Sequence, residues 1–268
     1  PQTHTDCHAM TDPVLLREEQ DGIACITLNR PRVLNALNTD LRAALSAFWR
    51  EFRDNPGLKV AIVTGAGGRA FSTGRDLKET AAADEAGGRV DYEKTGAFGY
   101  PGDLVLGKPV IAAVDGHCMA AGLMIAIGCD IRICTPEASF GNPQVKRGRG
   151  TRMPLKLAQA GLPRAVVMDM AMTGQPLNAE QALRWGLVSR IVPREQLLPT
   201  AWSIARTIVE NSPVVVAAIK RASEAGLLDL PINEALRIWD PLTGMMGNTA
   251  DAIEGARSFA AKEQAKFA

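Results

Sequence analysis

Short apolar runs alternate with segments of helical periodicity along the first half of the chain. Residues 14–18 and 23–28 are strand-like and flank Asp21-Gly22, a pair typical of tight hairpin turns. Asn38 is a good cap for a helix in which apolar residues recur every three or four positions, and residues 59–64 predict a buried strand after it. The chain is therefore expected to open with a hairpin, followed by a strand, a helix and a strand.

The same alternation recurs in the middle of the chain and predicts an α/β fold. Residues 108–114 form a second buried apolar run, residues 120–127 a helix of small residues, and residues 130–134 another strand. Such alternation favours right-handed crossovers on a largely parallel sheet. Beyond Gly141 the pattern becomes helical, with helices predicted at 164–172, 178–185, 194–211 and 214–225 and after Pro231 and Thr249.

Two segments carry no clear periodicity. Residues 81–103 are rich in Ala, Gly and charge, which fits a mobile surface lid and a plain linker equally well. Residues 1–12 are mostly polar, and we expect a disordered extension without a function. The first segment leaves two interpretations open, and the second lies outside the expected domain.

Composition and charge exclude several function classes. The 268 residues carry a formal net charge of +1, which provides no long-range field for nucleic acid or an acidic membrane. No apolar run reaches the roughly 20 residues that span a bilayer. The cysteines are odd in number and lack CxxC spacing, which predicts reduced thiols, no metal site and a cytoplasmic location. They are Cys7, Cys25, Cys118, Cys129 and Cys134.

Two glycine-containing turns are the candidate functional segments. Residues 70–77 place Ser72, Gly74 and Arg75 directly after a buried strand, and residues 108–117 lead through a second strand to Ala121 and Gly122. Backbone amides at such turns and helix starts are available to an anionic ligand. Taken singly, each segment is better explained by structure alone: the first by a turn that caps the next helix, and the second by close helix packing through small side chains.

As an ordered set, these segments resemble the crotonase superfamily, also called the enoyl-CoA hydratase/isomerase family, from about Leu15 to Phe267. The resemblance also includes Leu28-Asn29-Arg30-Pro31, Asn35-Ala36-Leu37, Met172-Thr173-Gly174, residues 182–188 and Asp251-Ala252-Ile253-Glu254-Gly255 with Phe259. It implies a spiral of ββα units over residues 13–200 and a helical trimerisation region over 201–268. It further implies a homotrimer or a dimer of trimers.

The resemblance implies that an acyl-CoA thioester is bound between the backbone amides of Arg75 and Ala121, with coenzyme A as the substrate carrier and no separate cofactor. Two such amides meet the negative charge that develops on the thioester oxygen, and each is typically worth about 3–4 kcal/mol of barrier. Relatives usually have glycine where this chain has Ala121, so a positive φ there would cost about 1 kcal/mol. Substrate contacts are expected at Arg32, Ser72, Gly74, Asp76, Gly122, Phe259 and Lys262.

The expected acid and base positions depart from the family pattern. Hydratases of the family carry glutamates at the places that Met124 and Gln144 occupy here. Methionine transfers no proton and glutamine has no usable pKa, so enoyl-CoA hydration should be severely weakened or absent. The basic residues 146–152 that follow are expected either to bind a carboxylate or phosphate or to form a solvated loop.

Other side chains near these positions are candidates to replace the missing acid and base. His117 is expected to be buried and structural, Asp76 to cap a helix, and Glu79 and Asp103 to lie near the pocket. Trp239 with Met245-Met246 fits an acyl pocket or, more simply, core packing. Three functions stay open: an acyl-CoA enzyme without the two-glutamate machinery, a weak hydratase, and a non-catalytic acyl-CoA-binding protein.

Overall fold

The computed structural model of the chain describes residues 12–85 and 99–267, and the predicted disordered extension lies almost wholly outside them. It opens with the expected hairpin, in which β1 (Leu15–Gln20) pairs antiparallel with β2 (Ile23–Leu28). The turn residues Asp21 and Gly22 have φ angles of 52° and 78°, as a two-residue turn of the hairpin type requires. The hairpin prediction is confirmed.

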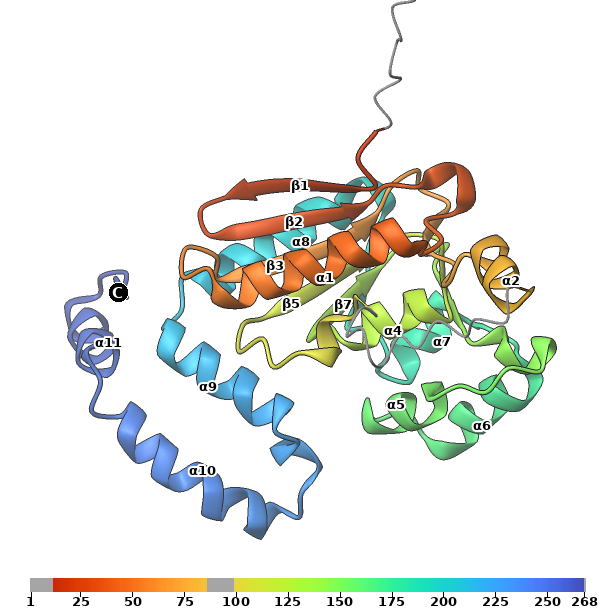
Figure 1. Cartoon of the computed structure of the whole chain (residues 1–268). Helices are drawn as coiled ribbons and strands as arrows, with labels where there is room; N and C mark the ends of the chain where they lie inside the picture. The colour runs from red at the N-terminus through yellow and green to blue at the C-terminus, as the bar shows by residue number, and fades with distance from the viewer. Residues whose placement is uncertain (1–11, 86–98, 268) are drawn as a thin grey trace, which may run out of the picture.

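Two sheets organise the core (Figure 1). The larger sheet has the order β1-β2-β3-β5-β7-β10, and every pairing after the hairpin is parallel. The smaller sheet has the order β4-β6-β8-β9. The remaining strands of the larger sheet are β3 (Val60–Gly65), β5 (Val110–Val114), β7 (Ile131–Cys134) and β10 (Arg190–Ile191), and those of the smaller sheet are β4 (Ala70–Ser72), β6 (His117–Met119), β8 (Ser139–Gly141) and β9 (Leu177–Asn178).

The strands β3, β5 and β7 are each followed by a short strand of the other sheet and then by a helix, which confirms the predicted ββα spiral. The helices that follow are α2 (Leu77–Glu85), α4 (Ala121–Ile127) and α5 (Met153–Gln159), the last after a short 3-10 turn. Further helices are α6 (Arg164–Thr173) and α7 (Ala179–Arg184). None of the helices in the described ranges is long and apolar enough to cross a membrane.

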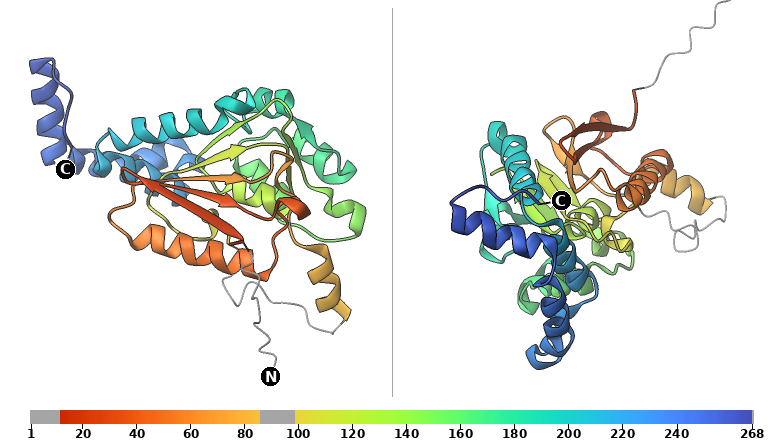
Figure 2. Two further views of the ribbon diagram at one scale, coloured as in Figure 1. Left: turned by 90° about the horizontal axis from the view of Figure 1, so that it is seen from above. Right: turned by 90° about the vertical axis from the view of Figure 1, so that its left-hand side faces the viewer.

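Helices α1 (Thr39–Asp54) and α8 (Arg194–Val209) cover opposite faces of the large sheet (Figure 2). Alternate residues of β2 point to the two sides, so that Ile26 belongs to the core under α1 and Cys25 to the core under α8. The start of α1 is fixed as predicted, because Asn38 Oδ1 accepts a hydrogen bond from Leu41 N at 3.0 Å. The predicted core boundary after residue 200 falls inside α8, so the sheet-packed core extends through that helix.

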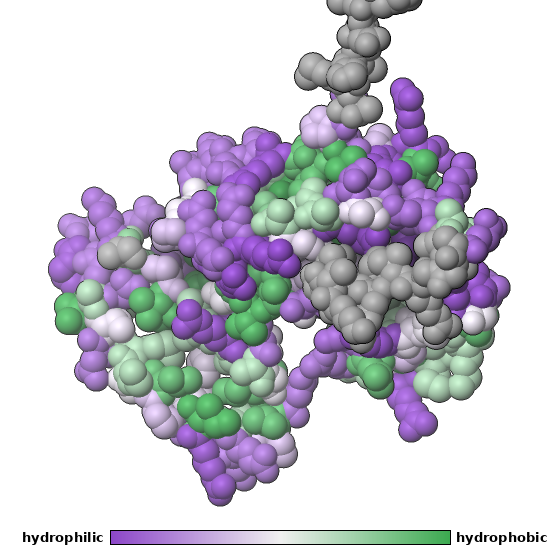
Figure 3. Space-filling view, in the orientation of Figure 1, coloured by the Kyte–Doolittle hydropathy of each residue, from purple (hydrophilic) through white to green (hydrophobic). Residues whose placement is uncertain are grey.

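The chain then leaves the core as an arm of three helices, α9 (Pro213–Glu224), α10 (Ile232–Met246) and α11 (Ala250–Ala261) (Figure 1). Helix α10 has no buried residue within the protomer, and Ile232 and Met245 are about 70% exposed. Apolar side chains gather over this region in the space-filling view (Figure 3). The expectation that Trp239 and Met245-Met246 pack in the protomer's own core is therefore wrong.

Candidate functional site

The first glycine turn is held by hydrogen bonds from a buried serine. Ser72 is fully buried, and its hydroxyl donates to Asn35 O at 2.8 Å while accepting from Gly74 N at 3.2 Å. Asn35 is itself buried and donates to Ala66 O and Ala70 O at 2.9 and 2.7 Å. We therefore assign the Ser72 side chain to support of the turn, although the sequence suggested that it contacts substrate.

The backbone on either side of Arg75 is bonded to the chain before α1. Leu37 N donates to Gly74 O at 2.8 Å, and Asp76 N donates to Leu37 O at 3.1 Å. These two bonds form the isolated parallel bridge between Leu37 and Arg75 and leave the Arg75 N–H outside the bridge. The peptide that carries this N–H is thus fixed from both ends.

The second turn joins β6 to α4 through a strained alanine. Ala120 has φ 49° and ψ −117°, and its N–H donates to Gly141 O at 2.8 Å. Ala121 is the first residue of α4, and its N–H has no hydrogen-bond acceptor among the residues described. The positive φ lies at Ala120, not at Ala121. The torsion angles of Ala120 set the plane of the peptide that carries the Ala121 N–H.

The two turns approach each other so closely that only glycine fits between them. A Cβ on Gly74 would lie 2.9 Å from Ala120 Cβ and 3.0 Å from Ala121 N. A Cβ on Gly122 would lie 2.4 Å from Ser72 O, so α4 begins directly against β4. The backbones that carry the Arg75 and Ala121 amides are thus brought together as the sequence suggested, and their binding of a thioester stays a prediction.

The predicted acid and base positions hold no carboxylate. Met124 is half-buried on the first turn of α4, three residues after Ala121. Gln144 is half-buried in the 3-10 turn Pro143–Arg147 after β8. Asp103 keeps contact with solvent, yet desolvation raises its pKa against the opposing charges of Arg152 and Lys156. Asp103 therefore supplies a carboxyl group, but at neither of the positions where hydratases of the family carry glutamate.

Tyr100 lies beside the first turn and was not singled out from the sequence. It is buried after Gly99, whose carbonyl accepts a hydrogen bond from Trp49 Nε1 at 3.0 Å. Burial raises the pKa of Tyr100, although a side-chain hydrogen bond with Arg75 acts in the opposite direction. The phenol is thus protonated at neutral pH. Residues 81–103, the predicted lid or linker, lack periodicity and contain no pattern that predicts a buried tyrosine. Residues 86–98 of this segment lie outside the described residues, and residues 81–85 belong to α2.

His117 is exposed, which corrects the expectation of burial. It begins β6 in the smaller sheet, and its Nδ1 lies 2.9 Å from Ser139 Oγ on β8. The prediction failed because the smaller sheet was not anticipated, and this position opens that sheet toward solvent. His117 therefore pairs with a neighbouring strand residue, four positions before Ala121 along the chain.

Asp76 caps α2, as predicted, and also pairs with an arginine. Its Oδ1 accepts from Lys78 N at 3.1 Å, and its Oδ2 lies 3.0 Å from Arg30 Nη1. Burial is the largest influence and raises the pKa of Asp76, but the hydrogen bonds and the charge of Arg30 together lower it. Nearby, Glu79 accepts from Thr39 N at 3.1 Å and so joins α2 to the start of α1.

Asp76→Asn is expected to retain the cap and remove only the charge. Because the folded pKa lies below the ordinary 3.8, the ion pair stabilises the protein above that pH, and its contribution is lost as the pH falls through the folded value. Urea unfolding should show a loss of about 1 kcal/mol at pH 7 that disappears in acid. Asp54→Asn, which breaks an exposed pair with Arg53, is the control and should change little. A loss that is independent of pH would contradict this assignment.

Three further substrate contacts were expected, and two of them lie away from the glycine turns within one protomer. Arg32 is exposed in the 3-10 turn Pro31–Val33. Phe259 is 87% exposed on α11, and Lys262 ends that helix. The arm that carries these two residues projects from the opposite end of the molecule from α2 and α5 (Figure 1). The basic loop after Gln144 is likewise exposed.

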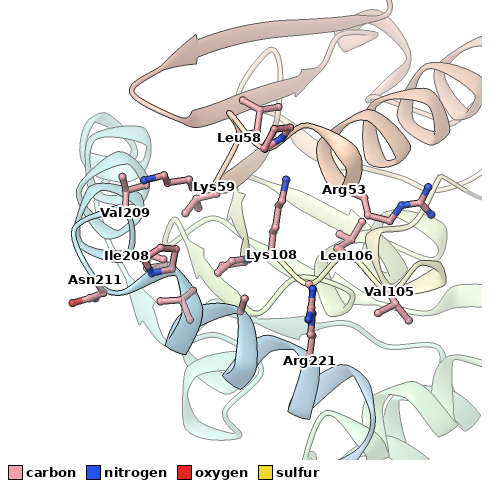
Figure 4. A pocket seen from close by; sticks show the side chains of 17 residues that line it. Arg53, Leu58, Lys59, Val105, Leu106, Lys108, Ile208, Val209, Asn211 and Arg221 are labelled. Carbon is pink, nitrogen blue, oxygen red and sulfur yellow. The ribbon is translucent and has the colours of Figure 1, made fainter. Parts of the chain in front are cut away.

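A cavity of about 560 Å³ lies at the amino ends of β3 and β5, away from the glycine turns (Figure 4). Lys59 and Arg221 contribute to its lining. Lys108, which also lines it, donates to Phe52 O and Asn55 O at 2.7 and 2.6 Å and thereby caps the end of α1. The parallel strands β3 and β5 carry the chain from this edge toward the turns at the other, so this cavity is separate from the candidate site.

The cysteines in the described ranges are reduced and buried. Cys25, Cys118, Cys129 and Cys134 form no disulfide, and burial raises the pKa of Cys25, Cys129 and Cys134 to about 12. They therefore behave as small hydrophobes, as the sequence suggested. Among the described residues, no cluster of His, Cys, Asp and Glu has the arrangement of a metal site.

Comparison with known proteins places this geometry in a family. The sequence profile named enoyl-CoA hydratase/isomerase matches residues 18–268. A protein of Thauera aromatica named (E)-benzylidenesuccinyl-CoA hydratase is 36% identical over 95% of this chain and 98% of its own. A carnitinyl-CoA dehydratase of Salmonella arizonae is 38% identical over 94% and 97%.

Solved structures agree with these sequence relatives. The crystal structure of an enoyl-CoA hydratase/isomerase from Mycobacterium paratuberculosis superposes with a TM-score of 0.86 at 31% identity, covering 95% of this chain and 98% of that one. An enoyl-CoA hydratase from Bacillus anthracis gives 0.83 at 27% identity, with the same coverage. The ββα spiral with its two facing glycine turns, read together with these matches, shows that the chain belongs to the enoyl-CoA hydratase/isomerase family of enzymes that act on CoA thioesters.

Proposed function

We propose that the protein transforms an acyl-CoA by stabilising negative charge on the thioester oxygen with the N–H groups of Arg75 and Ala121. The observation that carries the proposal is the contact between the two turns, where a Cβ on Gly74 would meet Ala121 N at 3.0 Å. Two fixed amides stabilise an enolate or a tetrahedral oxyanion without rearrangement when the charge forms. The Arg75 side chain does not affect this role, because a backbone donor tolerates side-chain change.

We further propose that the protein is not an efficient hydratase. Met124 and Gln144 supply neither an acid nor a base where hydratases of the family place glutamates. Isomerisation, C–C cleavage, decarboxylation and thioester hydrolysis remain open to the same oxyanion site, since each passes through an enolate or a tetrahedral oxyanion. A second candidate is weak hydration that uses another residue, and the relatives named hydratase and dehydratase favour it.

The exposed apolar surface of the arm supports a proposed homotrimer or dimer of trimers. Helix α10 buries none of its residues in its own protomer, which leaves that surface for another subunit. In such an assembly, Phe259 and Lys262 would contact the coenzyme A of a neighbouring subunit, as the family resemblance implies. The buried reduced thiols support the proposed cytoplasmic location.

The test is a panel of enoyl-, 3-hydroxyacyl-, malonyl- and saturated acyl-CoAs, with products followed by mass spectrometry. We expect turnover of at least one member, and crotonyl-CoA hydration about 10²-fold or more below that of a two-glutamate hydratase. Gln144→Glu restores one carboxylate and should raise the hydration rate. Hydration at the full rate by the unaltered protein would contradict the interpretation that Met124 and Gln144 make hydration inefficient.

Calorimetry with the same ligands separates enzyme from binding protein. Binding without any turnover would support the non-catalytic alternative, which the loss of both glutamates leaves open. If no acyl-CoA binds, both the enzymatic and the binding proposals fail.

A further inference from the structure

The cavity of about 560 Å³ lies where the helical arm leaves the core (Figure 4). Its walls come from the end of α1, the start of β3, residues 105–109 before β5, the end of α8 and the start of α9. Among the described residues, none of those that line it belongs to α10 or α11, which carry the proposed assembly surface. Its volume falls within the range of small-molecule sites, roughly 300–1,000 Å³.

The charged side chains along this cavity are all cationic. They are Arg53, Lys59, Lys108 and Arg221, and no Asp or Glu of the described residues lines it. The whole chain has 30 Lys and Arg against 29 Asp and Glu, so the cluster is a local excess of positive charge. Cations gathered in a cleft between apolar walls favour an anionic ligand.

The carboxylates nearest to the lining residues are engaged by other groups. Asp54 lies 2.7 Å from Arg53 in an exposed ion pair. Glu224 accepts hydrogen bonds from Leu106 N at 2.9 Å and from Gly107 N at 3.0 Å, which joins α9 to the segment before β5. The remaining cations of the cavity are therefore not neutralised by these two groups.

Two of those cations have no partner within the part of the chain that the structure describes. Neither Lys59 nor Arg221 forms a hydrogen bond, an ion pair or a contact with an aromatic ring there. Arg221 extends from α9 against Gly107, where an added Cβ would lie 3.3 Å from Arg221 Nε. Its guanidinium group is thus held beside the residue that precedes Lys108 and keeps its donors for a ligand.

Lys108 is fixed at the same place. Its ammonium group donates to Phe52 O at 2.7 Å and to Asn55 O at 2.6 Å, and an ammonium has a third N–H to donate. Desolvation lowers the pKa of Lys108 against the opposing charge of Asp54. An anion bound in the cavity would offset this desolvation, and the two carbonyl bonds hold the donor in position beforehand.

From the cavity, its uniform charge and its apolar walls, we infer a binding site for a small amphipathic anion, in which Arg221 and Lys108 bind a carboxylate or phosphate head group. The planar guanidinium group of arginine can bind either head group with two parallel hydrogen bonds. The alkyl body of the ligand contacts the apolar lining, which includes Leu58, Val60, Leu106, Pro109, Ile208 and Val216. The site is separate from the proposed thioester site and does not depend on it.

Calorimetry with octanoate and octyl phosphate, below their micellar concentrations, tests the inference. At least one of these anions should bind about 10-fold more tightly than octanol, which lacks the charge, and than acetate or inorganic phosphate, which lack the alkyl chain. The anion that binds more tightly identifies the head group as carboxylate or phosphate. Arg221→Met keeps the apolar stem but removes the donors, and should weaken this binding about 10-fold.

Arg184→Met is the matched control, because Arg184 at the end of α7 is also exposed but does not line the cavity. It should leave binding unchanged. Ala217→Phe fills the cavity from α9 and retains every cation, so it should abolish binding, while thermal melts report that each variant is folded. Equal losses in Arg184→Met and Arg221→Met would overturn the inference. Equal binding of octanol and the anions, or no binding of either anion, would overturn it as well.

Butyryl-CoA distinguishes this site from the proposed thioester site. It should not displace octanoate or octyl phosphate, and Arg221→Met should bind it as the unaltered protein does. Displacement would place the anion in the thioester site and overturn this inference, while the proposed function would stand. Failure of butyryl-CoA and the other acyl-CoAs to bind, with octanoate still bound, would remove the proposed function alone. If Arg221→Met changed the oligomeric state in light scattering, the cavity would belong to a neighbouring subunit and the inference would fail.

Discussion

Replacing Gly74 by alanine is expected to lower kcat/KM for any accepted acyl-CoA by about 10²–10³-fold. The new Cβ would lie 2.9 Å from Ala120 Cβ, 3.0 Å from Ala121 N and 3.1 Å from Met119 O, and two of these atoms are backbone. The two turns must therefore separate, which moves one amide donor away from the proposed position of the thioester oxygen. Loss of one such donor has an effect of this size on the chemical step.

A matched variant isolates the geometric effect from backbone strain. Gly161 has φ 88°, close to the 92° of Gly74, but nothing lies within 4 Å of its added Cβ. Gly161→Ala should therefore show a comparable loss of stability from the left-handed conformation and no loss of kcat/KM. Steady-state kinetics and urea unfolding on both variants check the prediction. Full activity in Gly74→Ala would show that the contact between the turns does not position the site.

Gly122→Ala is expected to destabilise the fold by about 3 kcal/mol or more. Its Cβ would lie 2.4 Å from Ser72 O and 2.9 Å from Ser72 C, which belong to the buried strand β4. No side-chain rotation relieves a contact with backbone, so α4 must shift away from the sheet. The midpoint of urea unfolding should fall, and binding of acyl-CoA should weaken with it, because α4 carries the Ala121 amide.

The control for this variant is another helical glycine. Gly244 in α10 has nothing within 4 Å of an added Cβ, and alanine has the higher helix propensity. Gly244→Ala should leave stability unchanged or raise it by up to about 1 kcal/mol. If Gly122→Ala unfolded at the same urea concentration as the unaltered protein, the tight approach of α4 to β4 would be wrong.

Local signals predicted local structure well. The Asp21-Gly22 hairpin and the helix cap at Asn38 appear as expected, since each depends on a few neighbouring residues. The order of the ββα units followed from the apolar runs and from the family resemblance.

Features that depend on distant contacts could not be predicted. The strain falls on Ala120 because the turn is shaped by Gly141 of another strand, which the chain reaches about 20 residues later. His117 is exposed because it is the first residue of a strand in the second sheet, which the hydrophobic periodicity did not predict.

The use of main-chain donors has a consequence for how this scaffold diversifies. In the proposed site, binding of the thioester carbonyl depends on the path of the backbone through two glycine turns, whereas acid–base chemistry depends on which side chains occupy positions such as 124 and 144. Mutation can therefore change the acid–base side chains without disturbing the backbone that binds the carbonyl. Proteins with this arrangement can change from one thioester reaction to another through a few substitutions. Each intermediate sequence would still bind its ligand.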